Sequence, residues 1–160
     1  MSRSLVLFIY NLLLPVFFIV AFPAWLLKMW KRGGYGTGLM ERFGSFSIDA
    51  SEEPRDVIYI HAVSVGEVFI ALKLIKQWLQ AEPNLKVVLA ATTSTGHAVA
   101  RENALAGVRV IYSPLDFNMI VTEVLSRFQP WQIVLIEAEV WPNFVNVARQ
   151  MKIPVAMINA

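Results

Sequence analysis

Hydrophobic residues follow two different patterns along the chain. Residues 4–27 are almost entirely apolar and contain no charged side chain, whereas from residue 56 onward short apolar runs alternate with segments whose apolar positions recur every three or four residues. An apolar run of about 20 residues or more is typical of a membrane-associated helix, and the second pattern is typical of alternating strands and helices. The sequence therefore predicts a hydrophobic N-terminal helix followed by an α/β domain.

The α/β part predicts five strands and four helices in alternation. The strands are expected at 57–62, 85–91, 108–114, 131–138 and 153–160. The helices are expected at 66–80, 94–105, 116–128 and 141–151, with Ser94 or Thr95 capping the second, Asp116 starting the third and Pro142 in the first turn of the fourth. Such alternation forms right-handed βαβ units, so we expect a Rossmann-like parallel sheet covered by helices on both faces. The order of the strands does not follow from the sequence.

Residues 1–30 are expected to anchor the chain in a membrane. Basic residues flank the apolar run, and aromatic residues suited to the membrane–water interface accompany them: Arg3, Tyr10, Trp25, Lys28, Trp30, Lys31 and Arg32. The excess of Lys and Arg after the run predicts that the following domain lies on the cytoplasmic side. Pro15 and Pro23 leave two geometries open, a kinked membrane span and a helix that lies in the interface.

A linker is expected between the anchor and the domain. Residues 31–56 are rich in Gly and Ser, and "LMERFG" within them predicts a short helix with a glycine stop. The α/β domain is then expected over residues 57–160.

Composition excludes several classes of function. The net charge of the 160 residues is only +2, which argues against a nucleic-acid-binding protein held by phosphate contacts. The chain has no cysteine, so disulfides, zinc thiolates and cysteine nucleophiles are excluded. The two histidines, His61 and His97, lack the spacing of metal ligands, and we expect no metal site.

Small and polar residues gather where the predicted strands end. They are Ser64, Gly66, Glu67, Thr92, Thr93, Ser94, Asp116, Glu137, Glu139 and Asn159. Ligands of open parallel sheets bind beyond the carboxyl ends of the strands, so this rim is the expected location of a site. Glu67 has two interpretations, an acid in the first turn of a helix or a general base. Glu137 and Glu139 share one face of an extended chain and are better site candidates than acids on a helix surface.

Other motifs on the rim are weaker. "SVG" and "TSTG" could each bind an anion at a helix N-terminus, but neither matches a dinucleotide fingerprint or a P-loop. Ser64 lacks the G-x-S-x-G context of a hydrolase nucleophile. Asp116 after "SP" is interpreted first as a helix N-cap and second as a ligand.

The motifs taken together resemble one family. "ERFG" follows the hydrophobic segment, and "HAVSVGE", "TTSTG", "YSPLDF", "EAEVWPN" and "IPVAMINA" come after it in the order seen in the 3-deoxy-D-manno-octulosonic acid (Kdo) transferases. The combination of "SVGE" with E-x-E-x-WPN is specific, although each piece alone is weak. Ser94, Ala138 and Val140 depart mildly from the family pattern, which commonly has Pro, Thr and Leu there.

The resemblance implies a two-domain glycosyltransferase of the GT-B type in the inner membrane. Such an enzyme takes Kdo from CMP-Kdo, with inversion, and places it on a hydroxyl of a lipid A precursor, lipid IVA, without a metal or a cofactor. Glu67 would be the general base, and Glu137 would stabilise or orient the reacting groups. The rim residues expected to bind the substrate are Ser64, Gly66, Thr93, Thr95, Gly96 and Asp116.

The resemblance also implies that this chain is only the acceptor-side half. The family's C-terminal nucleotide-binding domain lies beyond residue 160, so we expect the chain alone to be inactive. The alternative from another class is a membrane-tethered lipid-binding or interaction module without catalysis. A dehydrogenase-like nucleotide-binding enzyme is a third possibility, and the missing glycine fingerprint counts against it.

Overall fold

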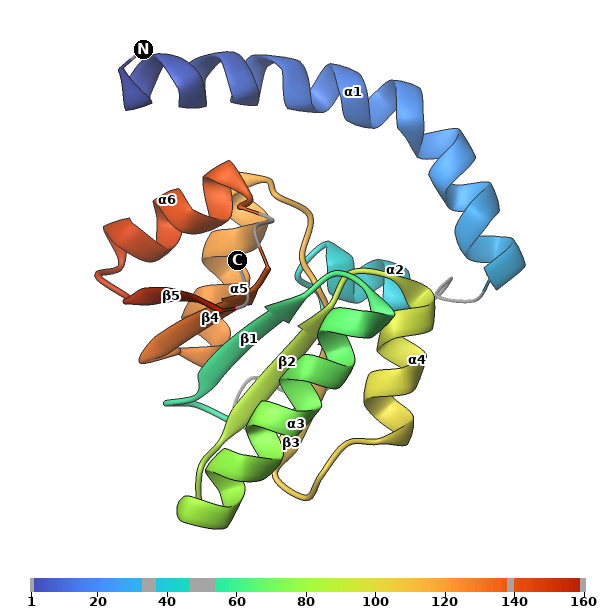
Figure 1. The fold of residues 1–160 in the computed structure, drawn as a ribbon. Coiled ribbons are helices and arrows are strands. Elements are labelled where there is room, and N and C mark those ends of the chain that lie inside the picture. Colours follow the sequence, from blue (N-terminus) through green and yellow to red (C-terminus); the bar gives the residue numbers. More distant parts are fainter. Residues whose placement is uncertain (1, 33–36, 47–53, 138–139, 159–160) are drawn as a thin grey trace.

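Five parallel strands form a single sheet in a computed structural model that describes residues 2–32, 37–46, 54–137 and 140–158 (Figure 1). The strands are β1 (Ile58–Ala62), β2 (Val87–Ala91), β3 (Val108–Tyr112), β4 (Gln132–Ile136) and β5 (Val155–Ile158). Their order across the sheet is β3-β2-β1-β4-β5, and every neighbouring pair is parallel. The predicted α/β class with a parallel sheet is confirmed.

Helices cover both faces of the sheet, as predicted. They are α3 (Val65–Ala81), α4 (Ser94–Glu102), α5 (Asn118–Phe128) and α6 (Pro142–Gln150). Successive strand residues point to opposite faces. Tyr59 therefore packs with residues of α5 and α6, whereas Ile58 and Ile60 pack with residues of α3. The two separate cores explain why β1 and β2 are buried along their whole length.

The strand order places a topological switch at the centre of the sheet. From β1 the chain moves outward through β2 to β3, and it then returns to pair β4 on the other side of β1. His61 near the end of β1 lies in register with Leu135 near the end of β4. Ligand crevices of open α/β sheets form at such a point, so the loops after β1 and β4 are the expected walls of a site.

The hydrophobic segment forms one long helix, α1 (Arg3–Arg32), which contains both prolines. Figure 1 shows α1 arching over the rest of the molecule, and curvature is the usual effect of prolines inside a helix. By length and composition α1 could cross a membrane. It nevertheless contacts α4 and α6, and it therefore lies across the carboxyl ends of the strands.

One row of α1 side chains faces the domain. The less exposed members recur at helical spacing: Leu7, Tyr10, Leu14, Phe18, Ala21, Phe22 and Trp25. Phe18 packs edge-on against Phe117, with ring centroids 5.5 Å apart. The opposite surface is apolar and open, with Phe17, Ile19 and Val20 between 70% and 75% exposed.

Polar groups join α1 to the domain at its N-terminal half. The Tyr10 hydroxyl donates to Asp116 Oδ2 at 2.8 Å, and the side-chain amides of Asn11 and Asn143 hydrogen-bond each other reciprocally at 2.8 and 3.0 Å. Arg3 donates to the side-chain carbonyl of Asn146. These contacts were not predicted, since polar residues in an apolar run show no partner in the sequence.

The predicted linker contains a helix that packs on the domain. Helix α2 (Thr37–Arg42) contacts β3. The Glu41 carboxylate accepts from the Tyr112 N–H at 3.0 Å, and the Arg42 carbonyl accepts from the Leu115 N–H at 2.8 Å. Gly44, with φ of +79°, ends the helix as the sequence predicts.

The predicted cap of α4 and the predicted start of α5 are wrong, whereas the predicted start of α4 at Ser94 and the place of Pro142 in the first turn of α6 are confirmed. Helix α4 is capped by Thr93 rather than by Ser94 or Thr95, because the Thr93 hydroxyl accepts from the Gly96 N–H at 3.1 Å. Helix α5 begins at Asn118 and not at Asp116, whose carboxylate points to α6 instead. Pro142 is the first residue of α6, where its missing N–H is not needed.

Candidate functional site

The loops after β1 and β2 meet at the rim of the sheet. The Thr92 N–H donates to the Ala62 carbonyl at 3.1 Å, and the Thr93 N–H approaches the Val63 carbonyl at 3.3 Å. Four of the predicted substrate-binding residues are exposed at the ends of these loops or in the first turns of α3 and α4 that follow them: Ser64, Gly66, Thr93 and Thr95. The structure thus brings together residues that lie about thirty positions apart in the sequence.

Glu67 closes a reciprocal capping box at the start of α3. One carboxylate oxygen accepts from the Val63 N–H at 2.7 Å and the other accepts from the Ser64 N–H at 3.0 Å, while the Ser64 hydroxyl accepts from the Glu67 N–H at 3.3 Å. The side chain is only 4% exposed. The first interpretation, an acid that starts a helix, is thus observed directly. Each oxygen has a second lone pair, so this geometry fixes the carboxylate without using its full accepting capacity.

His61 lies in the core beneath this loop. Its Nδ1 lies 3.3 Å from the Ser113 hydroxyl, and its ring contacts Trp141 and Phe144. Burial lowers the pKa of His61 to about 4, although the charge of Glu67 opposes the shift. The imidazole is therefore neutral at physiological pH. Within the described ranges, no group of three or more His, Cys, Asp or Glu side chains could hold a metal.

Glu137 follows β4, on the other side of the switch point. Its φ of +64° lies in the left-handed region, which a non-glycine residue seldom adopts. Its N–H donates to the Ile158 carbonyl at 2.8 Å, and its side chain is exposed. Such strained positions cluster at functional sites, where the surrounding structure holds them in place. Ala138, Glu139 and Asn159 lie outside the described residues.

The two glycines of the predicted site differ in what surrounds them. A Cβ on Gly96 would lie 2.8 Å from the Thr93 hydroxyl, so this glycine is needed for the cap of α4. A Cβ on Gly66 would meet, among the described residues, only the Ser64 hydroxyl, at 3.8 Å. The described part of the fold therefore leaves space above Gly66.

Asp116 is buried, with 3% exposure, and serves three structural hydrogen bonds. Its carboxylate accepts from the N–H groups of Asn143 and Phe144 at 3.0 and 2.7 Å, in addition to the Tyr10 hydroxyl. Burial raises its pKa, and the three hydrogen bonds act in the opposite direction. Asp116 thus holds the N-terminus of α6 and the helix α1 together, and the substrate-binding role predicted for it remains a hypothesis.

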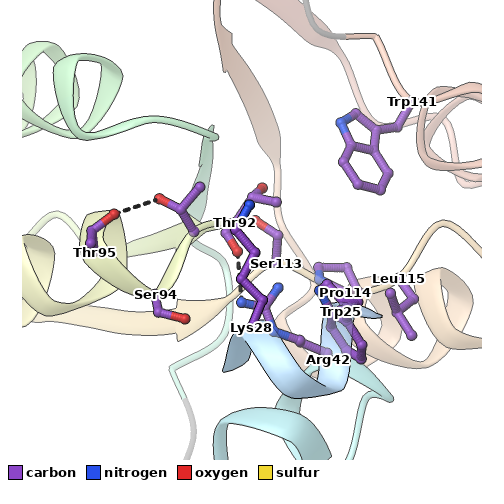
Figure 2. Close-up of a pocket in the computed structure, with 11 residues that line it drawn as sticks. Trp25, Lys28, Arg42, Thr92, Ser94, Thr95, Ser113, Pro114, Leu115 and Trp141 are labelled. Atoms are coloured by element: carbon purple, nitrogen blue, oxygen red, sulfur yellow. Dashed lines mark hydrogen bonds between the residues drawn. The ribbon is translucent and has the colours of Figure 1, made fainter. Parts of the chain in front are cut away.

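A cavity of about 250 Å³ opens between α1 and the rim (Figure 2). Its lining combines cations, hydroxyls and apolar groups: Trp25, Lys28, Arg42, Thr92, Thr93, Ser94, Thr95, Ser113, Pro114, Leu115 and Trp141. Neither Glu67 nor Glu137 is among these residues. The predicted residues Thr93 and Thr95 lie on its wall, at the N-terminus of α4.

Sequence reasoning missed the cations of this cavity. Arg42 was noticed only as part of a family motif, and Lys28 only as a charge that flanks the apolar run. Arg42 comes from α2 and Lys28 from α1, two elements outside the predicted domain. No sequence signal showed that both elements pack against the rim.

Comparison with known proteins gives one consistent result. Residues 37–160 match a family model described as 3-deoxy-D-manno-octulosonic-acid transferase (kdotransferase). Proteins named 3-deoxy-D-manno-octulosonic acid transferase are similar to the chain: that of Chlamydia pneumoniae is 29% identical over 151 residues (94% of this chain, 34% of the relative), that of Haemophilus influenzae 33% over 130 residues (81% and 30%), and that of Bordetella pertussis 33% over 144 residues (84% and 33%). The chain spans about a third of the length of these curated relatives.

Proposed function

Since the chain belongs to the family of 3-deoxy-D-manno-octulosonic acid (Kdo) transferases, we propose that it is the acceptor-side domain of an enzyme that transfers Kdo from CMP-Kdo to lipid IVA in lipopolysaccharide assembly. One observation carries the assignment of the site. Glu67 and Glu137 follow β1 and β4, the strands on the two sides of the topological switch. Ligands of open α/β sheets bind at that point, so both acids border the expected crevice.

The proposed reaction is a single displacement with inversion. A hydroxyl of the acceptor attacks the anomeric carbon of Kdo, the bond to the CMP oxygen breaks, and Glu67 takes the hydroxyl proton as general base. The hydrogen bonds from Val63 and Ser64 fix the orientation of this carboxylate. Glu137, held in its strained conformation, orients or stabilises the reacting groups. The proposal needs neither a metal nor a cofactor.

The membrane is the proposed source of the acceptor. Helix α1 uses one face for the domain and presents Phe17, Ile19 and Val20 outward. This two-faced arrangement supports a helix that lies in the membrane interface, since a perpendicular span would have to give up the hydrogen bond from Tyr10 and those of Asn11. The amphiphilic acceptor would then reach the rim from the membrane surface beside α1.

A reporter experiment tests the side of the membrane. A phosphatase or fluorescent protein fused after Ala160 is expected to report a cytoplasmic location, because Lys28, Lys31 and Arg32 follow the apolar run. Periplasmic phosphatase activity of the fusion would reject the cytoplasmic placement. Cysteines introduced at Phe17 and Val20, which should react only with a lipid-soluble thiol reagent, test the interfacial geometry.

Kdo transfer itself is tested with the protein that carries this chain, CMP-Kdo and lipid IVA, and Gly66→Ala is the informative variant. A methyl group there meets no atom of the described residues closer than 3.8 Å, and alanine favours a helix over glycine by up to about 1 kcal/mol. We expect thermal unfolding at the same or a higher temperature. Transfer should fall by about ten-fold to a hundred-fold, because a displaced acceptor loses its reacting geometry.

The stability of the same variant is the internal control. A loss of transfer in a protein that is at least as stable cannot come from unfolding. Unchanged transfer by Gly66→Ala would show that the acceptor does not bind next to this glycine. Absence of any Kdo transfer by the wild type, combined with retained lipid binding, would favour the alternative of a non-catalytic lipid-binding module.

A further inference from the structure

Arg42 is a buried cation that forms no ion pair within the described part of the chain. It is 4% exposed, and one guanidinium nitrogen donates to the Thr92 carbonyl at 2.6 Å. Its Nε is buried and has no hydrogen-bond partner, and no carboxylate of the described residues forms an ion pair with it. The neighbouring Glu41 carboxylate accepts from the Tyr112 N–H instead. The charge of Glu41 opposes the effect of burial on the pKa of Arg42, so it compensates the cation in part. A buried cation that is only partly compensated is costly, so this arrangement favours a bound anion.

The guanidinium is held in place by aromatic rings. Its central carbon lies 4.3 Å from the ring centroid of Tyr112 and 5.6 Å from that of Trp25. Contacts with ring faces leave the N–H edge of a guanidinium available for an anion. Burial lowers the pKa of Arg42 to about 10, so the group still carries its charge at neutral pH.

Further donors border the same cavity. The Thr92 hydroxyl is buried and has no hydrogen-bond partner among the described residues. The N-terminus of the nine-residue helix α4 adds backbone N–H groups and the positive end of the helix dipole. Lys28 comes from α1 and lines the same cavity as Arg42 (Figure 2). Donors from three elements suit an anion with several oxygens better than a flat carboxylate.

The remaining wall of the cavity is apolar. Trp25, Leu115 and Trp141 lie next to the donors, and Trp25 belongs to the same helix whose outer surface is open and hydrophobic. The volume of about 250 Å³ exceeds what a free phosphate needs. A ligand that joins a phosphate to an apolar body would contact both the donors and the apolar wall of the cavity.

We propose that this cavity is a phosphate-binding subsite that holds a phosphate monoester of the membrane amphiphile, with Arg42, Lys28, Thr92 and the α4 N-terminus as its donors. This inference rests on the proposed function and deepens it, since a lipid A precursor presents phosphates close to its sugar hydroxyls. Arg42 and Lys28 are here binding residues and take no part in proton transfer.

Direct binding tests the subsite without any transfer reaction. The purified chain in micelles of a neutral detergent is titrated by calorimetry with dihexanoyl phosphatidic acid, dihexanoyl phosphatidylcholine, inorganic phosphate and CMP. We expect phosphatidic acid to bind most tightly, inorganic phosphate to bind more weakly, and phosphatidylcholine not to bind. Arg42→Gln should raise the Kd for phosphatidic acid at least ten-fold, and Lys28→Gln should raise it several-fold.

Two exposed cations elsewhere on the chain provide matched control variants. Arg101→Gln on the exposed last turn of α4 and Lys31→Gln on α1 remove equal charges away from the cavity and should bind as the wild type does. Lys28 is exposed, so its variant remains informative if Arg42→Gln does not fold. Equal affinities in all variants would overturn the subsite, and tighter binding of CMP than of phosphatidic acid would overturn the lipid assignment. Kdo transfer can fail while this binding stands, which keeps the two proposals separable.

Discussion

Glu67→Gln is expected to lower Kdo transfer by about 10²- to 10⁴-fold, the usual contribution of a general base. Glutamine keeps the size of the side chain but cannot accept the proton of the acceptor hydroxyl. Initial rates of the wild type and the variant with CMP-Kdo and lipid IVA provide the measurement.

The same substitution also weakens the fold, and the two effects must be separated. The glutamine amide can accept from only one of the two N–H groups that Glu67 now serves, those of Val63 and Ser64. Loss of a helix cap costs about 0.5–2 kcal/mol, which chemical denaturation measures. Glu102→Gln, at the exposed C-terminal end of α4, is the matched control and should transfer Kdo at the wild-type rate. If the Glu67→Gln protein is folded and transfers Kdo at the wild-type rate, Glu67 is not the general base.

Asp116→Ala should be strongly destabilising, with a loss of about 3 kcal/mol in the free energy of unfolding. The substitution leaves two buried N–H groups of α6 and the Tyr10 hydroxyl without their acceptor, and each unsatisfied donor costs about 1–3 kcal/mol. Tyr10→Phe removes only one of these bonds and should cost about 1 kcal/mol. Denaturant unfolding of both variants measures the difference. Equal losses in the two variants would show that the hydrogen bonds from α6 to Asp116 do not contribute to the free energy of unfolding.

The pH dependence gives an independent check on Asp116. Burial raises its pKa above the value in the unfolded chain, so between the two values the native state binds more protons. The contribution of this carboxyl to stability therefore falls as the pH rises through that window. Asp116→Asn, which does not titrate, should flatten this part of the curve of unfolding free energy against pH.

Local patterns in the sequence were enough to predict the sheet and its helices. Val68, Leu72 and Ile75 recur at helical spacing and are buried on α3. The short apolar runs became strands with almost the predicted bounds. These features depend on residues that are neighbours in the sequence, and the period of the pattern carries the information.

Contacts between distant segments could not be predicted in the same way. Asp116 looked like the cap of its own helix, but its carboxylate serves α6, some thirty residues further on. Tyr10 suited a membrane interface, and its hydroxyl donates to that same carboxylate. Neither contact leaves a periodic signal, because a single side chain and a single partner decide it. The cavity cations were missed for the same reason, since Arg42 and Lys28 meet only in three dimensions.

The docking of α1 on the rim bears on how the protein is purified. Hydrophobic N-terminal helices are often removed to obtain a soluble protein, but here that cut would also take away Trp25 and Lys28, one wall of the cavity. It would uncover Phe117 and leave the Asn143 amide without Asn11. A detergent that inserts between α1 and the domain would have the same effect on an intact chain. Binding measured after truncation or in a harsh detergent would therefore describe a cavity that lacks the wall formed by α1.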